Sequence, residues 1–369
     1  MFARDRIDLA LRSATAFLLD RQSPDGAWRS NIYGLFKTGD ALTPLVLRAL
    51  TAAPFLSECL PRLRRGAEYL AALARPDGSI DEAPHGLNYP AYTAGLTVLG
   101  LSQPIFSEHR KACEAWLSYL RERQLTEPLG WQPSDREYGG WGYTHALPRK
   151  PVPGQPADLL TESNLSATVF ALAALRAAGR PGEEAFVKAL VFVRRCQNYA
   201  EAPGSAFDDG GFFFMVADAW RNKAGPLGTD ETGRQRYASY GSMTADGLRA
   251  LLYCGLHRED ARVVAARRWL ERNFSASIHP GQFAPGRAAL RASIYYYYAS
   301  SLAQALAAAD AGEMTPGSSE ALAEELLRRQ RPDGSWVNDA FEVREDDPLV
   351  ATPLAIEALA MCRGTITAG

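Results

Sequence analysis

The sequence has few of the residues that build metal sites, disulfide frameworks or nucleophilic active sites. Its 369 residues include only 5 cysteines and 5 histidines. The cysteines lie far apart without a C-x-x-C pair, which argues against a disulfide framework and a cysteine-rich zinc site. The spacings H-x-x-x-H and H-E-x-x-H, the G-x-S-x-G motif and a phosphate-binding P-loop are all missing. We therefore expect neither a metal nor a cofactor.

A charge excess of either sign is also missing. The 40 basic and 42 acidic side chains leave a formal charge of −2, which disfavours nucleic acid as a partner. The first residues lack the apolar stretch of a secretory signal, and no uncharged run is long enough to span a bilayer. Hydrophobic residues make up 47% of the chain, which provides for a large ordered core. These features predict an ordered cytoplasmic protein.

What the sequence does contain is an internal repeat. Q-S-P-D-G-A-W at 22–28 and Q-R-P-D-G-S-W at 330–336 each follow an apolar segment. A degraded copy, R-P-D-G-S-I, lies at 75–80, and looser copies end at Trp141 and Phe212. Each copy predicts that a helix ends, that Pro-Asp-Gly forms the turn, and that the aromatic residue packs back on the preceding helix end.

Nearly uncharged segments rich in alanine and leucine follow these turns. Such segments are typical of helices buried on most sides, and we expect them to start near Thr43, Thr93, Ser166, Met243, Tyr298 and Thr352. Helices with charged surfaces are expected between them, for example at 106–124, 183–197, 259–273 and 317–330.

Alternating inner and outer helices fit an open solenoid or a closed barrel. The repeat is long and variable here, and its loops are long and aromatic, which favours the closed form. We predict an all-α fold, an α6/α6 barrel of about six helical hairpins with its loops gathered at one mouth. No linker-like segment interrupts the pattern, so we expect one domain over residues 1–369.

The two complete repeats resemble the QW motifs of squalene–hopene cyclase and oxidosqualene cyclase. The chain from about Phe17 to Ala360 is similar to the prenyltransferase/squalene-oxidase repeat group. Four segments also resemble bacterial single-domain relatives of these cyclases: 209–214, 222–225, 240–244 and 295–298. The resemblance implies an α6/α6 barrel whose cavity accepts an isoprenoid. It does not by itself transfer the chemistry.

The acidic motif that the resemblance leads us to look for is missing. Class II cyclases protonate an alkene with a carboxylic acid of a D-x-D-D-T-A motif at the start of an inner helix. In this chain Asn164, Leu165 and Ser166 stand at that place, and Glu162 is the only acid close by. An amide or a hydroxyl group is too weak an acid to protonate an alkene. Any acid must therefore come from another part of the chain.

Protein prenyltransferase β-subunits are a second group that the chain resembles locally. There a G-G-F turn is followed by N-K, which holds diphosphate, and by D-G-C, which contributes to a zinc site. Here Arg221-Asn222-Lys223 follows the turn, and the D-G-C counterpart is Tyr240-Gly241-Ser242, which is a poor set of zinc ligands. Arg221 and Lys223 are candidate anion anchors, or alternatively part of a solvated loop.

Four aspartates are our candidate catalytic acids: Asp208, Asp209, Asp246 and Asp347. If Asp208 and Asp209 are buried, repulsion between them could keep one protonated, although both could instead cap a turn. Asp347 precedes the last inner helix, where the simplest role is an N-cap. Asp246 lies in an apolar helix, so it either faces outward or is a buried working acid.

Aromatic side chains gather at predicted loop ends and helix starts. Their ring faces can stabilise a carbocation by about 0.5–2 kcal/mol each, and as a set they suit a polyene better than a sugar. With two mouth-loop histidines they complete the candidate substrate-binding residues: Tyr89, Trp141, Tyr143, Phe212, Tyr240, Tyr295, Tyr298, His85 and His145. The run Tyr295 to Tyr298 points its rings in several directions, so at least one should face the cavity.

The interpretation that we favour is an isoprenoid-binding enzyme, a noncanonical terpene or triterpene cyclase that starts cyclisation with an acid. Within the same enzyme interpretation, the chain could instead transfer a prenyl group. A noncatalytic isoprenoid carrier or interaction module is the main alternative, and a carbohydrate-active barrel is a third. Peripheral membrane contact stays open, with candidates at Leu99–Leu101 and Ile105–Phe106 that ordinary helix packing explains equally well. The sequence leaves the oligomeric state undetermined.

Overall fold

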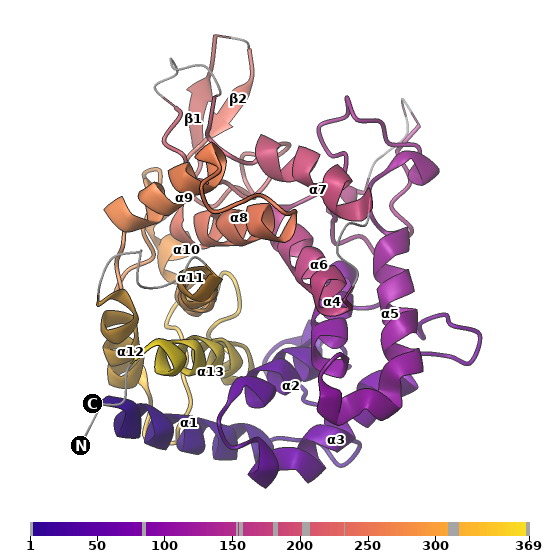
Figure 1. Cartoon of the computed structure of the whole chain (residues 1–369), viewed down its shortest axis with the longest axis vertical. Helices are drawn as coiled ribbons and strands as arrows, with labels where there is room; N and C mark the ends of the chain where they lie inside the picture. Colours follow the sequence, from indigo (N-terminus) through magenta and orange to yellow (C-terminus); the bar gives the residue numbers. More distant parts are fainter. Residues whose placement is uncertain are drawn as a thin grey trace.

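Two concentric rings of helices make up the structure, a computed structural model that describes residues 3–82, 86–152, 154, 158–179, 184–200, 207–231, 233–308 and 317–366. The inner ring is closed, because each of its helices packs against the next and the last packs against the first (Figure 1). In ring order the inner helices are α2 (Leu42–Ala52), α4 (Pro90–Leu101), α6 (Leu165–Ala177), α8 (Gly241–Tyr253), α11 (Tyr295–Ala308) and α13 (Pro348–Thr365). The predicted all-α, α6/α6 barrel is confirmed.

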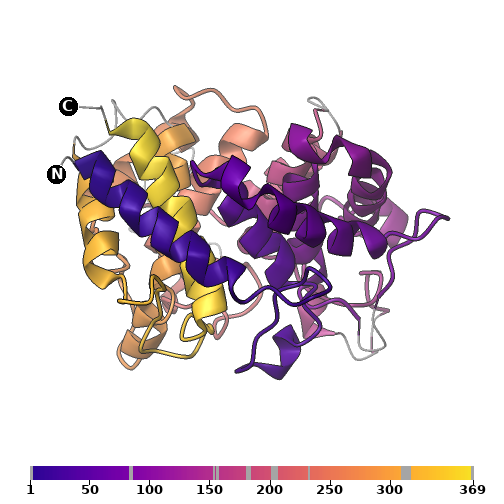
Figure 2. The ribbon, with the colours of Figure 1, turned by 90° about the horizontal axis from the view of Figure 1, so that it is seen from below.

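An outer helix packs against each part of this ring. The outer helices are α1 (Ala3–Leu19), α3 (Leu56–Ala72), α5 (Arg110–Glu122), α7 (Glu184–Arg195), α9 (Ala261–Arg272) and α12 (Ser318–Arg329). α1 lies along α13, so the first and last helices complete the two layers (Figure 2). Every inner start predicted from the sequence falls within an inner helix. The outer helices α5, α7, α9 and α12 lie within the four predicted outer ranges. Residue 183, the first of the range 183–197, lies outside the described residues.

The remaining described elements are short. They include α10 (Ala288–Ala292), four 3₁₀ helices (Gly34–Phe36, Pro104–His109, Glu127–Leu129 and Leu159–Thr161) and one hairpin, β1 (Pro226–Thr229) and β2 (Gln235–Tyr237). The hairpin projects from one edge of the ring (Figure 1). Among the helices that the structure describes, none combines the length and the apolar character needed to cross a membrane.

Burial separates the two rings as the charge pattern predicts. In α6, every residue from Leu165 to Leu175 is buried, because the helix lies between the outer ring and the barrel interior. In the outer helix α5 the buried residues Trp116, Leu117 and Leu120 lie on one side, as in an amphipathic helix. Leu101 and Phe106, part of the candidate membrane patch, are buried at 2% and 0% exposure and belong to the core. These two side chains therefore present no surface to a lipid.

The glutamine and tryptophan of the first repeat join α1 to α3. The Trp28 indole Nε1 donates to the Leu18 carbonyl at 2.7 Å, and so packs back on the end of α1 as predicted. Gln22 Nε2 donates to the carbonyl of Arg62 in α3 at 2.8 Å. Gly26 has φ of +94°, and a Cβ there would overlap the Arg65 carbonyl, so the turn requires glycine.

The last repeat makes the same bonds and closes the outer ring. Trp336 Nε1 donates to Leu326 O at 2.8 Å, and Gln330 Nε2 donates to Ala10 O of α1 at 2.9 Å. Gln124 and Gln197 link α5 to α7 and α7 to α9 in the same way, through the carbonyls of Ala185 and Arg262. The repeat glutamines therefore tie successive outer helices together.

Candidate functional site

A cavity of about 280 Å³ lies at the N-terminal ends of the inner helices. All six inner helices contribute to its wall, together with the loops that precede them. Six aromatic side chains line it: Phe36, Tyr89, Tyr92, Tyr143, Phe214 and Tyr297. Its ionisable lining residues apart from the tyrosines are Lys223, Glu342, Arg344 and Glu345. The cavity is thus mostly apolar and aromatic with a few charged groups.

Three aromatic residues of the wall, Tyr89, Tyr92 and Tyr143, make edge-to-face contacts. The Tyr89 ring lies 5.2 Å from that of Tyr143, and the Tyr92 ring lies 4.7 Å from that of Phe170. Tyr89 has φ of +47°, a left-handed conformation that a bulky residue rarely adopts. Pro90 follows it at the first position of α4 and fixes the start of the helix. The strained residue therefore sits in the cavity wall, at the start of an inner helix.

Glu345 is the carboxyl group of this cavity with the most unusual environment. It is 1% exposed, and its two oxygens accept hydrogen bonds from the backbone N–H groups of Tyr296 and Tyr297, both at 2.8 Å. Asn338 Nδ2 donates a third bond at 3.1 Å. Burial outweighs these donors and raises the pKa of Glu345 to about 7. Both protonation states are therefore populated near neutral pH.

Lys223 is an amine in the same cavity without a bonded acceptor. Among the described residues its Nζ forms no hydrogen bond or salt bridge, and it lies 4.9 Å from the centroid of the Phe214 ring. Burial lowers the pKa of Lys223 to about 8, although the charge of Glu345 acts in the opposite direction. The neighbouring Asn222 is fully buried and bonds the backbone of Phe214, Met215 and Asp218. This bonding fixes the loop that carries the lysine.

Tyr297 connects the cavity to a buried ion pair. Its hydroxyl donates to Asp246 Oδ2 at 2.7 Å and is hydrogen-bonded to Ser166. Asp246 is fully buried and lies 3.0 Å from the guanidinium of Arg249, which is also buried. Burial raises the pKa of Asp246 above its ordinary value even though Arg249 and the hydroxyl groups favour its charged form. Asp246 is therefore a buried acid one side chain away from the cavity.

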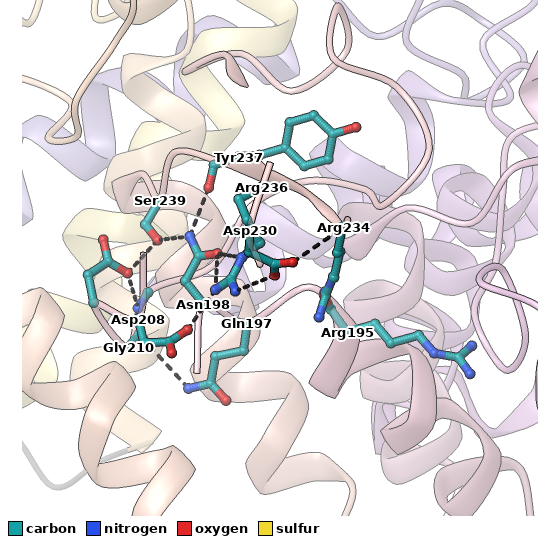
Figure 3. A network of polar contacts seen from close by, with 12 residues as sticks. Arg195, Gln197, Asn198, Asp208, Gly210, Asp230, Arg234, Arg236, Tyr237 and Ser239 are labelled. Carbon is teal, nitrogen blue, oxygen red and sulfur yellow. Dashed lines mark hydrogen bonds and ion pairs between the residues drawn. The ribbon is translucent and has the colours of Figure 1, made fainter. Parts of the chain in front are cut away.

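Asp208 and Asp209 do not line this cavity. Figure 3 shows Asp208 in a polar network with Asn198, Arg236 and Ser239. Arg236 Nη2 lies 2.6 Å from Asp208, and Asp209 accepts hydrogen bonds from Ser239 Oγ and from the indole of Trp269. Since Arg236 belongs to β2, this network attaches the hairpin to the loop that follows α7.

Asp347 and Arg221 also lie outside the cavity lining. Asp347 caps α13 by accepting from Leu349 N at 2.9 Å, and it accepts a second bond from the Ser30 hydroxyl. Burial raises the pKa of Asp347. Arg221 forms salt bridges with Glu162 and Asp218. The structure therefore separates Arg221 from Lys223, its expected partner as an anion anchor.

The predicted substrate-binding residues divide between the cavity and the core. Tyr89, Tyr143 and Lys223 line the cavity. Five others are buried away from its lining: Trp141, Phe212, Tyr240, Tyr295 and Tyr298. Trp141 and Phe212 occupy the aromatic position of their repeats, and the hydroxyls of Tyr295 and Tyr298 donate to the carbonyls of Ala276 and Ser275. His145 is exposed, and His85 lies outside the described residues.

Two functional candidates were missed by the sequence analysis, Glu345 and Tyr297. Glu345 belongs to the charged run E-V-R-E-D-D at 342–347, whose composition predicts a solvated loop. Tyr297 belongs to the tyrosine run, where helical geometry predicts one cavity-facing ring but does not identify it. At the place of the missing acidic motif, Asn164 caps α6 by accepting from Ala167 N at 2.8 Å. Among the described residues, no group of three or more His, Cys, Asp and Glu side chains is placed to hold a metal ion.

Several solved structures share this fold. A variant of the type II terpene cyclase MstE from Scytonema, in complex with its substrate geranylgeranyl dihydroxybenzoate, matches with a TM-score of 0.62 and 15% identity over 99% of both chains. A protein from Actinoplanes matches with a TM-score of 0.60 and 17% identity over 98% of this chain and 100% of that one.

A glycosidase variant in complex with glucose also matches, with a TM-score of 0.52 and 11% identity over 99% of this chain and 98% of that one. No protein-family model matches the sequence, and no curated protein matches it. At these identities the likeness shows a common fold, which terpene cyclases and a glycosidase share. The fold is therefore one that this chain shares with proteins of different activities, and the function must be argued from the cavity.

Proposed function

We propose that this chain is a terpene cyclase-like enzyme that binds an isoprenoid in the aromatic cavity and starts its cyclisation with an acid. The observation that carries the proposal is a buried carboxyl group, Glu345, in a cavity whose wall is otherwise dominated by aromatic and aliphatic side chains. A polyene buries apolar surface against such a wall, whereas a sugar would leave most of its hydroxyl groups without partners.

Glu345 is the proton donor in this proposal. Its protonated carboxyl group transfers the proton to one carbon of a double bond, the π electrons form the new C–H bond, and the neighbouring carbon becomes a cation. Attack by the next double bond on this cation closes a ring. With a pKa of about 7, the resulting carboxylate regains a proton from solvent near neutral pH.

The cavity rings stabilise the positive charge as it moves along the chain. Each favourably placed ring contributes about 0.5–2 kcal/mol, and Phe36, Tyr89, Tyr92, Tyr143, Phe214 and Tyr297 are the available rings. Because Phe36, Tyr89 and Tyr143 are already packed against one another, these three rings need little reorganisation when the cation forms. Loss of a proton from the last cation completes an isomerisation with no net consumption of acid.

A noncatalytic isoprenoid carrier is the second candidate. The observation that favours it is Asn164, a helix cap at the place where class II cyclases hold their acid. A carrier and an enzyme share the same cavity, so binding alone does not distinguish them.

One experiment separates the two candidates. The purified chain is incubated with squalene, geranylgeraniol and geranylgeranyl diphosphate, ligand binding is measured as a rise in melting temperature, and products are identified by mass spectrometry. An enzyme that uses Glu345 should lose about 10²-fold or more of its turnover in Glu345→Gln and still bind ligand. Binding without any product in the wild-type chain would support the carrier. No binding of any isoprenoid would contradict both candidates.

A further inference from the structure

Two basic groups line the cavity, and they differ in whether the described residues supply a hydrogen-bond acceptor. Arg344 Nη1 already donates to the Tyr89 hydroxyl at 2.8 Å, and its guanidinium lies 5.6 Å from the Tyr33 ring centroid. Lys223 Nζ, in contrast, faces the Phe214 ring and has no acceptor among the residues that the structure describes. Lys223 is partly buried, and an ammonium group that has lost part of its hydration without gaining an acceptor is costly. A ligand that supplies an acceptor would remove that cost.

The charges around Lys223 limit which anion fits. Glu342 and Glu345 line the same cavity, and their carboxylates repel a ligand that carries several negative charges. Arg221, which could have helped to neutralise a diphosphate, is held by Glu162 and Asp218. Lys223 and Arg344 are the two basic groups of the lining, and Glu342 and Glu345 leave the cavity without an excess of positive charge, which fits a ligand with a single negative charge better than a diphosphate.

We infer that the ligand is an isoprenoid acid, and that Lys223 binds its carboxylate head group while the aromatic wall holds the polyprenyl tail. This inference rests on the proposed function and specifies its substrate class. The ammonium of Lys223 would donate a charge-assisted hydrogen bond to the carboxylate, which is stronger than a bond between neutral groups.

Binding of such an acid would also prepare the proton donor. A carboxylate on Lys223 places a negative charge in the cavity that Glu345 shares, and a nearby negative charge favours the protonated form of a carboxyl group. The substrate would therefore increase the fraction of Glu345 that carries the reacting proton. A neutral prenyl alcohol has no such effect.

The inference is tested by comparing ligands with the same tail. We expect the wild-type chain to bind geranylgeranoic acid about 10- to 100-fold more tightly than geranylgeraniol, as one charge-assisted hydrogen bond would give, and more tightly than geranylgeranyl diphosphate. Lys223→Met should remove the preference for the acid, so that the acid and the alcohol bind this variant with similar affinity. Lys37→Met, at an exposed lysine, is the matched control and should change neither affinity. Isothermal titration calorimetry measures all three chains.

The outcomes distinguish this inference from the proposed function. If acid and alcohol bind wild-type chain equally, if Lys223→Met weakens both equally, or if the diphosphate binds best, the inference is wrong although isoprenoid binding stands. If none of the three ligands binds, the proposed function fails and the inference fails with it. The preference for the acid should also decrease as the pH is raised through about 8, where Lys223 loses its proton.

Discussion

Replacing Glu345 with glutamine should change how the stability of the chain depends on pH. The pKa of this carboxyl group is 4.5 in an unfolded chain and about 7 in the folded one. Below pH 4.5 both states hold the proton, so burial of the neutral group carries no ionisation cost. Above pH 7 the folded state must hold a buried carboxylate. Each pH unit between the two values corresponds to about 1.4 kcal/mol, so the wild-type chain loses about 3 kcal/mol of unfolding free energy as the pH rises from 4.5 to 7.

The glutamine side chain is neutral at every pH and avoids this loss. The measured quantity is the unfolding free energy of Glu345→Gln minus that of the wild-type chain, obtained from urea denaturation at pH 5.0, 6.0, 7.0 and 8.0. The subtraction removes the contributions of all titrating groups whose pKa values are the same in the two chains. We expect the difference to increase with pH by about 3 kcal/mol and to level off above pH 7.

Glu342→Gln is the matched control, because Glu342 belongs to the same segment and borders the same cavity but is exposed. The Glu345→Gln difference should change with pH by more than the Glu342→Gln difference does. A Glu345→Gln difference that does not change with pH would refute the reasoning, since it would mean that the buried carboxyl group ionises as readily as one in water. The proposed role of Glu345 as a proton donor would then lose its physical basis.

Three further predictions concern the barrel and its buried hydroxyl and imidazole groups. Tyr297→Phe keeps the aromatic ring but removes the hydroxyl that donates to Asp246, so urea denaturation should show an unfolding free energy lower by about 1–3 kcal/mol. If the wild-type chain converts a substrate, the Tyr297→Phe variant should still convert it. Gln330→Ala removes the two bonds that its amide donates, one of them to α1, and should cost about 1–3 kcal/mol in the same assay, whereas an unchanged stability would contradict its role in closing the ring. Burial lowers the pKa of His279 from 6.5 to about 3, so the stability that the neutral imidazole provides above pH 6.5 is lost as the pH falls. As the pH falls from 6.5 to 5, the unfolding free energy of the wild-type chain should therefore decrease by about 2 kcal/mol more than that of His279→Gln. Parallel plots of unfolding free energy against pH for the two chains would contradict this.

The fold could be predicted because its signals are local in the sequence. A helix that is apolar on all sides must be buried on all sides, and turn residues with fixed conformational requirements separate the outer helices from these inner segments. The complete repeats at 22–28 and 330–336 keep glutamine and tryptophan six residues apart. Gln124 and Trp141 make the same hydrogen bonds as these pairs, but a longer loop separates them. Their equivalence is therefore visible only in space.

The site was harder to predict because it depends on which side of an element faces the cavity. Tyr295 and Tyr298 lie one helical turn apart and direct their hydroxyls to the carbonyls of residues 276 and 275. Tyr297 points elsewhere and reaches the cavity. Sequence spacing groups residues by face but does not say which face is inward when all of them are tyrosine. Similarly, Asp208 and Glu345 both belong to acidic loops, and only the packing around them shows which one borders the cavity.

The barrel geometry explains how an acid can be present although the expected motif is not. The inner helices all begin at the same end, so a side chain carried at the start of any of them can reach one shared cavity. α6, where the motif is missing, stands opposite α13 in the ring, and Glu345 lies on the loop that leads into α13. In the proposed reaction the proton therefore enters from the opposite wall. It follows that the polyene would have to lie in the cavity with its reacting double bond near the start of α11, where the Glu345 carboxyl group is bonded, and that the stretch around Asn164 is free to serve only as a helix cap.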